Sequence, residues 1–325
     1  MTRFLVAGLR MLCLFGLLVG VAGCSKKSRP ENTSQMGQPP NTVVATTVPV
    51  PPASTTGLLN PESVRYDADL DVFFVSNVNG APSDKDGNGF ISKIDPAHPA
   101  TAARFIESGK NGAVLNGPKG MAIVGDTLWV ADIDALRAFN KRTGAVVATI
   151  DFTPLHPTFL NDVAAAPDGT LYLTDTGIRI DASGATTHPG KDRIYAVSGR
   201  TPRIAMEDEH LASPNGIAWD RANSRLLLAP STNIMVQSWR PADPRVGLVA
   251  AGKGGYDGIE VLPDGSFLIT SWTDSSLGIG HAGEGIRRIA GGIDGPADLG
   301  VDLRRGWIAV PRLNANQVDW FSLPF

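Results

Sequence analysis

The chain has 325 residues, of which 42% are hydrophobic and 19% charged, and its formal net charge is −3. This composition excludes a disordered chain and an electrostatic nucleic-acid binder, because apolar residues are abundant and basic residues are scattered. Both cysteines, Cys13 and Cys24, lie within the first 24 residues. The rest of the chain therefore has no cysteine for a disulfide or a thiolate metal site, and a metal there needs oxygen or nitrogen ligands.

Residues 1–23 have the pattern of a bacterial lipoprotein signal peptide. Arg3 and Arg10 accompany an apolar stretch that ends in Val21-Ala22-Gly23-Cys24, which is similar to a lipobox. The stretch is shorter than the roughly 20 residues of a membrane span. We expect cleavage before Cys24, lipidation of Cys24 and anchoring at the bacterial cell envelope. In a host with two membranes, Ser25 favours the periplasmic face of the outer membrane; an uncleaved anchor and a secreted protein are the alternatives.

Residues 24–57 are expected to form a disordered tether after the lipidated cysteine. This segment is rich in Pro, Ser and Thr and shows no apolar period that could bury a face. Residues 58–325 remain, which is enough for one substantial domain, and we expect that domain to be a monomer.

Short apolar or alternating runs recur along residues 58–325 and predict an all-β fold. Turn pairs precede several of them, as Asp168-Gly169 precedes Leu171–Leu173. Six tripeptides recur at intervals of 40 to 57 residues, beginning at Glu62, Lys119, Asn161, Asn215, Asp257 and Ala297. Six such units with room for four strands each predict a six-bladed β-propeller, with insertions near 77–89 and 176–191. Gln317–Phe321 is expected to close the ring against the segment before Glu62.

The first residues of the six tripeptides, which we call the lead residues, are expected to surround one mouth of the central channel. Glu62, Asn161, Asn215 and Asp257 would then supply two carboxylates and two amides. Oxygen ligands of this kind suit a hard divalent cation, most naturally Ca²⁺, with Mg²⁺, Mn²⁺ and Zn²⁺ as alternatives. Each residue taken singly is also an ordinary turn former.

Four segments resemble the metal-site motifs of the senescence marker protein, regucalcin and gluconolactonase family. They are Asn60–Val64, Leu160–Val163, Ser213–Ala218 and Gly255–Ile259. The resemblance implies a six-bladed propeller that acts as a divalent-metal-dependent lactonase. It implies that Glu62, Asn215 and Asp257 bind the metal directly and that Asn161 contacts substrate or metal-bound water.

The function that follows is hydrolysis of a lactone or related ester, a small-molecule substrate, at the channel mouth. The cation would polarise the carbonyl group. The resemblance implies that Asp257 is the base. Asp162 and Lys119 are the alternatives for sharing that role, and Lys119 is alternatively a binding group for an anionic substrate. The other class left open is a non-catalytic, calcium-stabilised propeller that binds a glycan, peptide or protein.

A second acidic cluster lies in the first insertion. Asp84, Asp86, Asn88 and Asp95 match ligand positions of an EF-hand-type loop, with Asp in place of Glu at the last position. Pro96 prevents the exit helix of an EF-hand, and an Asp- and Gly-rich hairpin needs no ion. A calcium loop and an ordinary hairpin are therefore both compatible with this segment.

Overall fold

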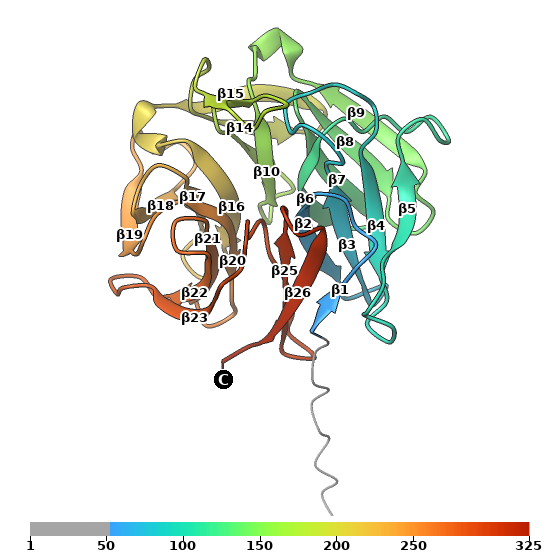
Figure 1. The fold of residues 1–325 in the computed structure, drawn as a ribbon. Helices are drawn as coiled ribbons and strands as arrows, with labels where there is room; N and C mark the ends of the chain where they lie inside the picture. The colour runs from blue at the N-terminus through green and yellow to red at the C-terminus, as the bar shows by residue number, and fades with distance from the viewer. Residues whose placement is uncertain (1–52, 325) are drawn as a thin grey trace, which may run out of the picture. The chain divides into compact units, whose positions relative to one another are not determined.

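The computed structural model describes residues 53–324, which form six four-stranded antiparallel sheets (Figure 1). The sheets are the blades of a propeller, numbered here along the chain and given from the innermost strand outward. Blades one to three comprise β2 (Pro61–Asp67), β3 (Val72–Asn77), β4 (Phe90–Ile94) and β5 (Ala103–Glu107); β6 (Pro118–Val124), β7 (Thr127–Asp132), β8 (Ala135–Asn140) and β9 (Val146–Asp151); and β10 (Leu160–Ala165), β11 (Leu171–Asp175), β14 (Arg193–Ser198) and β15 (Thr201–Glu207). Blades four to six comprise β16 (Pro214–Asp220), β17 (Arg225–Pro230), β18 (Met235–Trp239) and β19 (Gly247–Ala251); β20 (Tyr256–Val261), β21 (Phe267–Ser271), β22 (Ser276–Gly280) and β23 (Arg287–Gly291); and β24 (Gly300–Asp302), β25 (Trp307–Arg312), β26 (Gln317–Ser322) and β1 (Ser54–Thr55). The prediction of an all-β, six-bladed propeller is confirmed.

The ring closes where the two ends of the described chain meet in one sheet. Strand β1 pairs with β26 through Ser54 opposite Asp319 and Thr55 opposite Val318. The buried Thr55 hydroxyl accepts a hydrogen bond of 2.8 Å from Trp320 Nε1. Strand β1 precedes Leu58, so the sixth blade takes its outermost strand from residues that the sequence assigned to the tether. Cys24 and most of the predicted tether lie outside the described residues.

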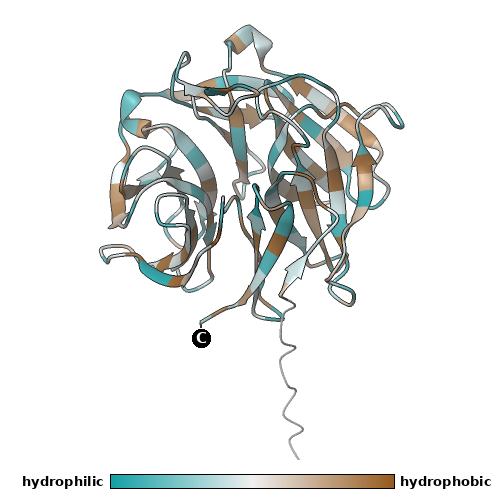
Figure 2. Cartoon of the chain, in the orientation of Figure 1, coloured by the Kyte–Doolittle hydropathy of each residue, from teal (hydrophilic) through white to brown (hydrophobic). Residues whose placement is uncertain are grey.

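The hydrophobic core is divided among the six interfaces between adjacent blades. Each of six apolar clusters joins residues of two neighbouring sheets, as Leu173 of blade three joins Ile150 of blade two. Figure 2 shows apolar and hydrophilic residues alternating along the strands. This division follows from the side-chain period of two, because both faces of a blade pack against a neighbour.

The predicted insertions separate the second and third described strands of two blades. Strand β3 ends at Asn77 and β4 begins at Phe90, whereas the longer insertion between β11 and β14 contains the hairpin of β12 (Arg179–Ile180) and β13 (Thr186–Thr187). Because the second strand of each blade runs back toward the lead residues, both insertions lie on the face that carries them. Among residues 53–324 the helices are the 3-10 turns η1 (Thr153–Leu155) and η2 (Glu209–Leu211), and neither is long and apolar enough to cross a membrane.

Candidate functional site

The lead residues sit at irregularities of the innermost strands. In blades one to five the pairing of the first and second strands shifts register at this point, for example between Leu160 and Val163 and between Tyr256 and Ile259. A bulge of this kind redirects side chains out of the regular alternation. The bulges therefore explain how polar lead residues on buried strands can face the channel instead of the apolar core.

Glycines beside the lead residues let the innermost strands approach one another closely. A Cβ atom on Gly120 would lie 2.5 Å from Asp162 Cα, and one on Gly258 would lie 2.5 Å from Asp298 Cα. Any side chain at these two positions would push adjacent blades apart. The small second residue of these tripeptides thus keeps the channel narrow enough for lead residues of different blades to interact.

Hydroxyl groups on the second strands satisfy the backbone N–H groups that the bulges leave unpaired. Thr174 Oγ1 accepts from Asp162 N at 3.0 Å and donates to Asn215 O of the next blade. Thr270 Oγ1 likewise accepts from Gly258 N at 2.8 Å and donates to Ala297 O at 3.0 Å. The two hydroxyls link blade three to the lead residue of blade four and blade five to the lead residue of blade six.

Glu62 and Asp257 are buried carboxylates that interact with each other across the channel mouth. They are 7% and 6% exposed, and Glu62 Oε2 and Asp257 Oδ1 are buried without a hydrogen-bond partner among the described residues. Burial, and then the charge of Asp257, raise the pKa of Glu62 well above its usual range. Burial and the charge of Asp298 raise the pKa of Asp257 to about 7. The positive charge of Lys119 opposes this shift at Glu62 but does not cancel it, so the two acids remain with raised pKa values.

Two of the lead residues, Asn161 and Asn215, carry side-chain amides. Asn161 is 3% exposed and donates from Nδ2 to Thr176 Oγ1 at 2.8 Å, while that hydroxyl donates to Pro214 O at 2.9 Å. This relay fixes the Asn161 NH₂ group and leaves its amide oxygen as the free acceptor. Asn215 is partly exposed and hydrogen-bonds to Asp257. Both amides can therefore contribute oxygen ligands beside the two carboxylates.

Lys119 is buried, and its ammonium group is occupied by backbone carbonyls. Nζ donates to Pro82 O and Gly117 O, each at 2.9 Å, and lies 4.1 Å from the ring centre of Phe159. Burial lowers the pKa of Lys119 to about 8, and the carboxylates of Glu62 and Asp132 oppose this shift. The hydrogen bond to Pro82 O connects Lys119 to the first insertion. The positive charge of Lys119 also attracts the Glu62 carboxylate.

Asp162, the other residue predicted as a possible base, has both oxygens engaged by backbone groups. Oδ1 accepts from Val163 N at 2.7 Å and Oδ2 accepts from Ile217 N at 2.9 Å. Arg65 Nη2 lies 3.7 Å from Asp162 Oδ1. These contacts join blades three and four, so both carboxylate oxygens of Asp162 are held by backbone N–H groups.

The predicted calcium loop does not assemble as a single cluster. Asp86 binds the Asn88 side chain, and Asp84 lies in the same turn region, but β4 separates these residues from Asp95. Five extended residues span roughly 17 Å, so Asp95 is carried to the far end of the strand. There its carboxylate accepts from Ala97 N and contacts His98. The spacing of an EF-hand loop requires a turn where this chain forms a strand, and the four-residue interpretation is wrong.

Trp272 and Thr176 support the lead residues from outside the six tripeptides and were not predicted from the sequence. Trp272 Nε1 donates to Asp257 Oδ2 at 2.9 Å while 42% of Trp272 is exposed. Thr176 orients Asn161 as described above. The hydroxyl residues 12 or 13 positions after the bulges were a detectable signal. The indole was not, because only the fold places Trp272 next to Asp257.

A cavity of about 510 Å³ lies among the insertions on this face. Its lining includes Ser83, Lys85, Thr158 and Arg179, and it borders the segment that holds Phe159 over Lys119. Lys85 forms an ion pair with Asp134 at its edge. The cavity is large enough for a small organic molecule beside the channel mouth.

The donor set is compatible with a divalent cation. No group of three or more His, Cys, Asp or Glu side chains within residues 53–324 is placed to hold a metal ion. The lead residues instead combine two acids with two amides, a composition that hard cations accept. The unpartnered Glu62 Oε2 and Asp257 Oδ1 are the atoms that such an ion would satisfy.

The fold and the site define a class of protein. It is a propeller with acidic and amide side chains at one mouth of its channel. The family model described as the SMP-30/gluconolactonase/LRE-like region matches residues 62–293. The chain belongs to this family. A solved structure titled as the nidogen/laminin complex is similar with a TM-score of 0.53 and 18% identity, covering 68% of this chain and 76% of that one, which shows the fold alone. No curated protein matches the sequence.

Proposed function

We propose that the protein hydrolyses a lactone or related ester at the channel mouth with the help of a divalent cation, most naturally Ca²⁺. The observation that carries this proposal is the pair of buried, unpartnered carboxylate oxygens of Glu62 and Asp257 in a propeller of this family. Glu62, Asn161, Asn215 and Asp257 would hold the cation. Its chemistry is to polarise the substrate carbonyl and stabilise the developing oxyanion.

The chain's own residues account for the proton transfers. Water adds to the ester carbonyl carbon, and Asp257 takes a proton from that water. The bond between the carbonyl carbon and the alkoxy oxygen then breaks, and the proton passes to that oxygen, so a lactone yields a hydroxy acid. Trp272 Nε1 holds Oδ2 of Asp257, which fixes the carboxylate for this role. Burial and the charge of Asp298 raise the pKa of Asp257 to about 7 in the ion-free site, and a bound cation would lower it.

Lys119 does not act as the base. It supplies a positive charge and holds the first insertion through its hydrogen bond to Pro82 O. Its ammonium is bound to Pro82 O and Gly117 O, so taking a proton from water would require it to lose these contacts. The positive charge next to Glu62 favours an anionic product or substrate group. We assign the base to Asp257 on this ground.

The test is a panel of lactones and aryl esters with Ca²⁺ and with EDTA. We expect hydrolysis that EDTA abolishes and that Asp257→Asn lowers by about 10² or more. Asp168→Asn, which changes an exposed turn carboxylate, is the matched control and should retain activity. Absence of metal-dependent hydrolysis across the panel, with partner binding retained, would place the protein in the binding class instead.

The sequence of residues 1–24 supports a further proposal about location. We propose that lipidation at Cys24 anchors the propeller at the bacterial cell envelope, on the periplasmic face of the outer membrane where the host has two membranes. Mass spectrometry of the membrane fraction should find an acylated cysteine. Cys24→Ser should release the protein from that fraction, and an unmodified cysteine in a soluble wild-type protein would contradict the proposal.

A further inference from the structure

Trp272 is an exposed aromatic side chain beside the carboxylate of Asp257. It follows β21 on the face that carries the lead residues, and 42% of it is exposed. The other large hydrophobic side chains that are exposed among residues 53–324 are aliphatic. A single exposed apolar residue is common on protein surfaces, but Trp272 is also fixed in place and adjoins the candidate site.

The indole of Trp272 is fixed at both of its ends. At one end, Nε1 donates to Asp257 Oδ2 at 2.9 Å. At the other end, the loop between blades five and six lies close to the six-membered ring, because a Cβ atom on Gly295 would be 3.3 Å from Cη2. The backbone is held as well, since Trp272 N donates to Gly255 O at 2.8 Å. A ring held in this way is a rigid apolar surface, and a ligand that binds it orders few additional torsions.

The contact with Asp257 places this surface next to the groups proposed to react. Asp257 Oδ1 is unpartnered and is an atom proposed to bind the cation, whereas Oδ2 of the same carboxylate accepts from the indole. A substrate whose carbonyl group lies at the cation therefore has the Trp272 ring within the length of one small molecule.

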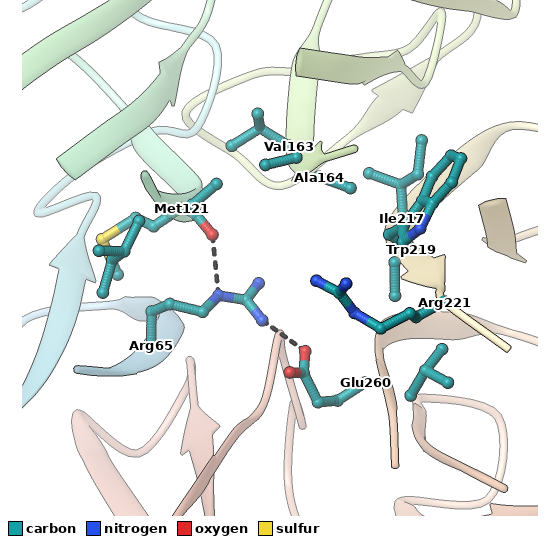
Figure 3. A pocket seen from close by; sticks show the side chains of 13 residues that line it. Arg65, Met121, Val163, Ala164, Ile217, Trp219, Arg221 and Glu260 are labelled. Carbon is teal, nitrogen blue, oxygen red and sulfur yellow. Dashed lines mark hydrogen bonds and ion pairs between the residues drawn. The ribbon is translucent and has the colours of Figure 1, made fainter. Parts of the chain in front are cut away.

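The other end of the channel is obstructed by Arg65, so substrate approaches from the face that carries Trp272. The guanidinium donates to Met121 O at 2.8 Å, to Glu260 Oε2 at 2.7 Å and to Asp298 Oδ2 at 2.8 Å. These bonds tie blade one to blades two, five and six across the channel, and Figure 3 shows those to Met121 and Glu260. Arg65 also lines a cavity of about 270 Å³ at that other end.

We propose that Trp272 is a specificity-determining residue whose indole face binds a flat apolar group of the substrate. This inference rests on the proposed hydrolysis and narrows its substrate class to lactones or esters that carry an aromatic ring. A ring stacked on the indole buries apolar surface and adds an aromatic contact. A compact aliphatic lactone leaves the indole uncovered and gains neither.

Calorimetric titration of the full-length protein with two lactams, in excess Ca²⁺, tests the proposal without requiring turnover. The probes are γ-butyrolactam and oxindole, which is its benzo-fused analogue, and the amide resists hydrolysis in both. We expect oxindole to bind wild type about tenfold more tightly than γ-butyrolactam, because only oxindole has a ring that can cover the indole.

Two variants separate the aromatic face from the indole N–H group. Trp272→Phe and Trp272→Leu both lose the hydrogen bond to Asp257, so an effect of that loss on the cation is common to them. Trp272→Phe should keep most of the preference for oxindole, whereas Trp272→Leu should lose most of it. Leu248→Ala is the control, because Leu248 is an exposed apolar residue on the outermost strand of blade four, and its variant should keep the wild-type preference.

The proposal is overturned if oxindole binds wild type no better than γ-butyrolactam does. It is also overturned if Trp272→Leu keeps the wild-type preference, or if Trp272→Phe loses as much of it as Trp272→Leu. Failure of the proposed hydrolysis has a different signature, because hydrolysis is measured as turnover of lactones. A protein that prefers oxindole through Trp272 but hydrolyses no lactone would keep the aromatic binding site and contradict the hydrolysis.

Discussion

Replacing Arg65 with methionine should destabilise the propeller strongly, because one guanidinium neutralises several buried acids. The Arg65 side chain is 14% exposed and contacts Glu260, Asp298 and Asp162. The side chains of Asp298 and Asp162 are only 3% and 2% exposed. Removing one partner of a buried ion pair costs about 3–5 kcal/mol. For a domain of this size that corresponds to a fall in Tm of roughly 6 to 20 °C.

The same substitution should acquire a characteristic pH dependence. Without Arg65, the folded-state pKa values of Asp298 and Asp162 rise further above their unfolded values, because the charge that lowers them is removed. A folded state that holds more protons than the unfolded state loses stability as pH rises. Thermal unfolding of Arg65→Met should therefore show a larger deficit relative to wild type at pH 8 than at pH 5. Arg142→Met, which removes an exposed guanidinium paired with exposed acids, should cost less than about 1 kcal/mol. A loss for Arg65→Met no larger than for this control, or a deficit independent of pH, would refute the reasoning.

Three further predictions concern the channel mouth. Thr174→Val should lower the free energy of unfolding by about 1–3 kcal/mol in denaturant titrations, because the N–H of Asp162 and the carbonyl of Asn215 lose their shared partner; an unchanged midpoint would contradict the bridging role. Trp272→Phe should weaken Ca²⁺ binding by about tenfold in calorimetry while leaving the fold intact, because the indole N–H no longer orients Asp257, and equal affinities would remove Trp272 from the site. The increase in Tm caused by Ca²⁺ should be larger at pH 8 than at pH 5: the ion-free pKa of Asp257 is about 7, so stability is lost as pH rises through that value, and a bound cation removes this loss.

The fold was predictable because its determinants are local and repeated. The turn at Asp168-Gly169 illustrates this, since Gly169 adopts φ 84° and Asp168 Oδ1 accepts from Thr170 N. A tripeptide that recurs in six blades is likewise visible in the chain without any knowledge of its partners. The outermost strand of blade six was not visible, because two residues before Leu58 carry little pattern of their own and pair only through ring closure.

The candidate site was predictable only in part, for a related reason. The positions of Glu62, Asn161 and Asp257 follow from the repeat register. What their side chains contact depends on neighbouring blades, which the sequence order does not reveal. Asp162 bonds to Ile217 of the next blade, and Trp272 reaches Asp257 from the end of a different strand. The calcium-loop prediction at Asp84 was wrong because it used only the spacing of the acidic residues. Strand β4 lies between Asn88 and Asp95 and separates them.

The most direct test of the account is a calorimetric Ca²⁺ titration of the chelator-stripped protein. We predict that wild type binds one tightly held ion at the channel mouth and that Glu62→Gln weakens this binding by about tenfold or more, because one of two carboxylate ligands is lost. Glu284→Gln, which changes an exposed carboxylate, should bind as wild type does. Failure of wild type to bind Ca²⁺, Mg²⁺, Mn²⁺ or Zn²⁺, or equal affinities of wild type and Glu62→Gln, would contradict the metal site and the hydrolysis proposed from it.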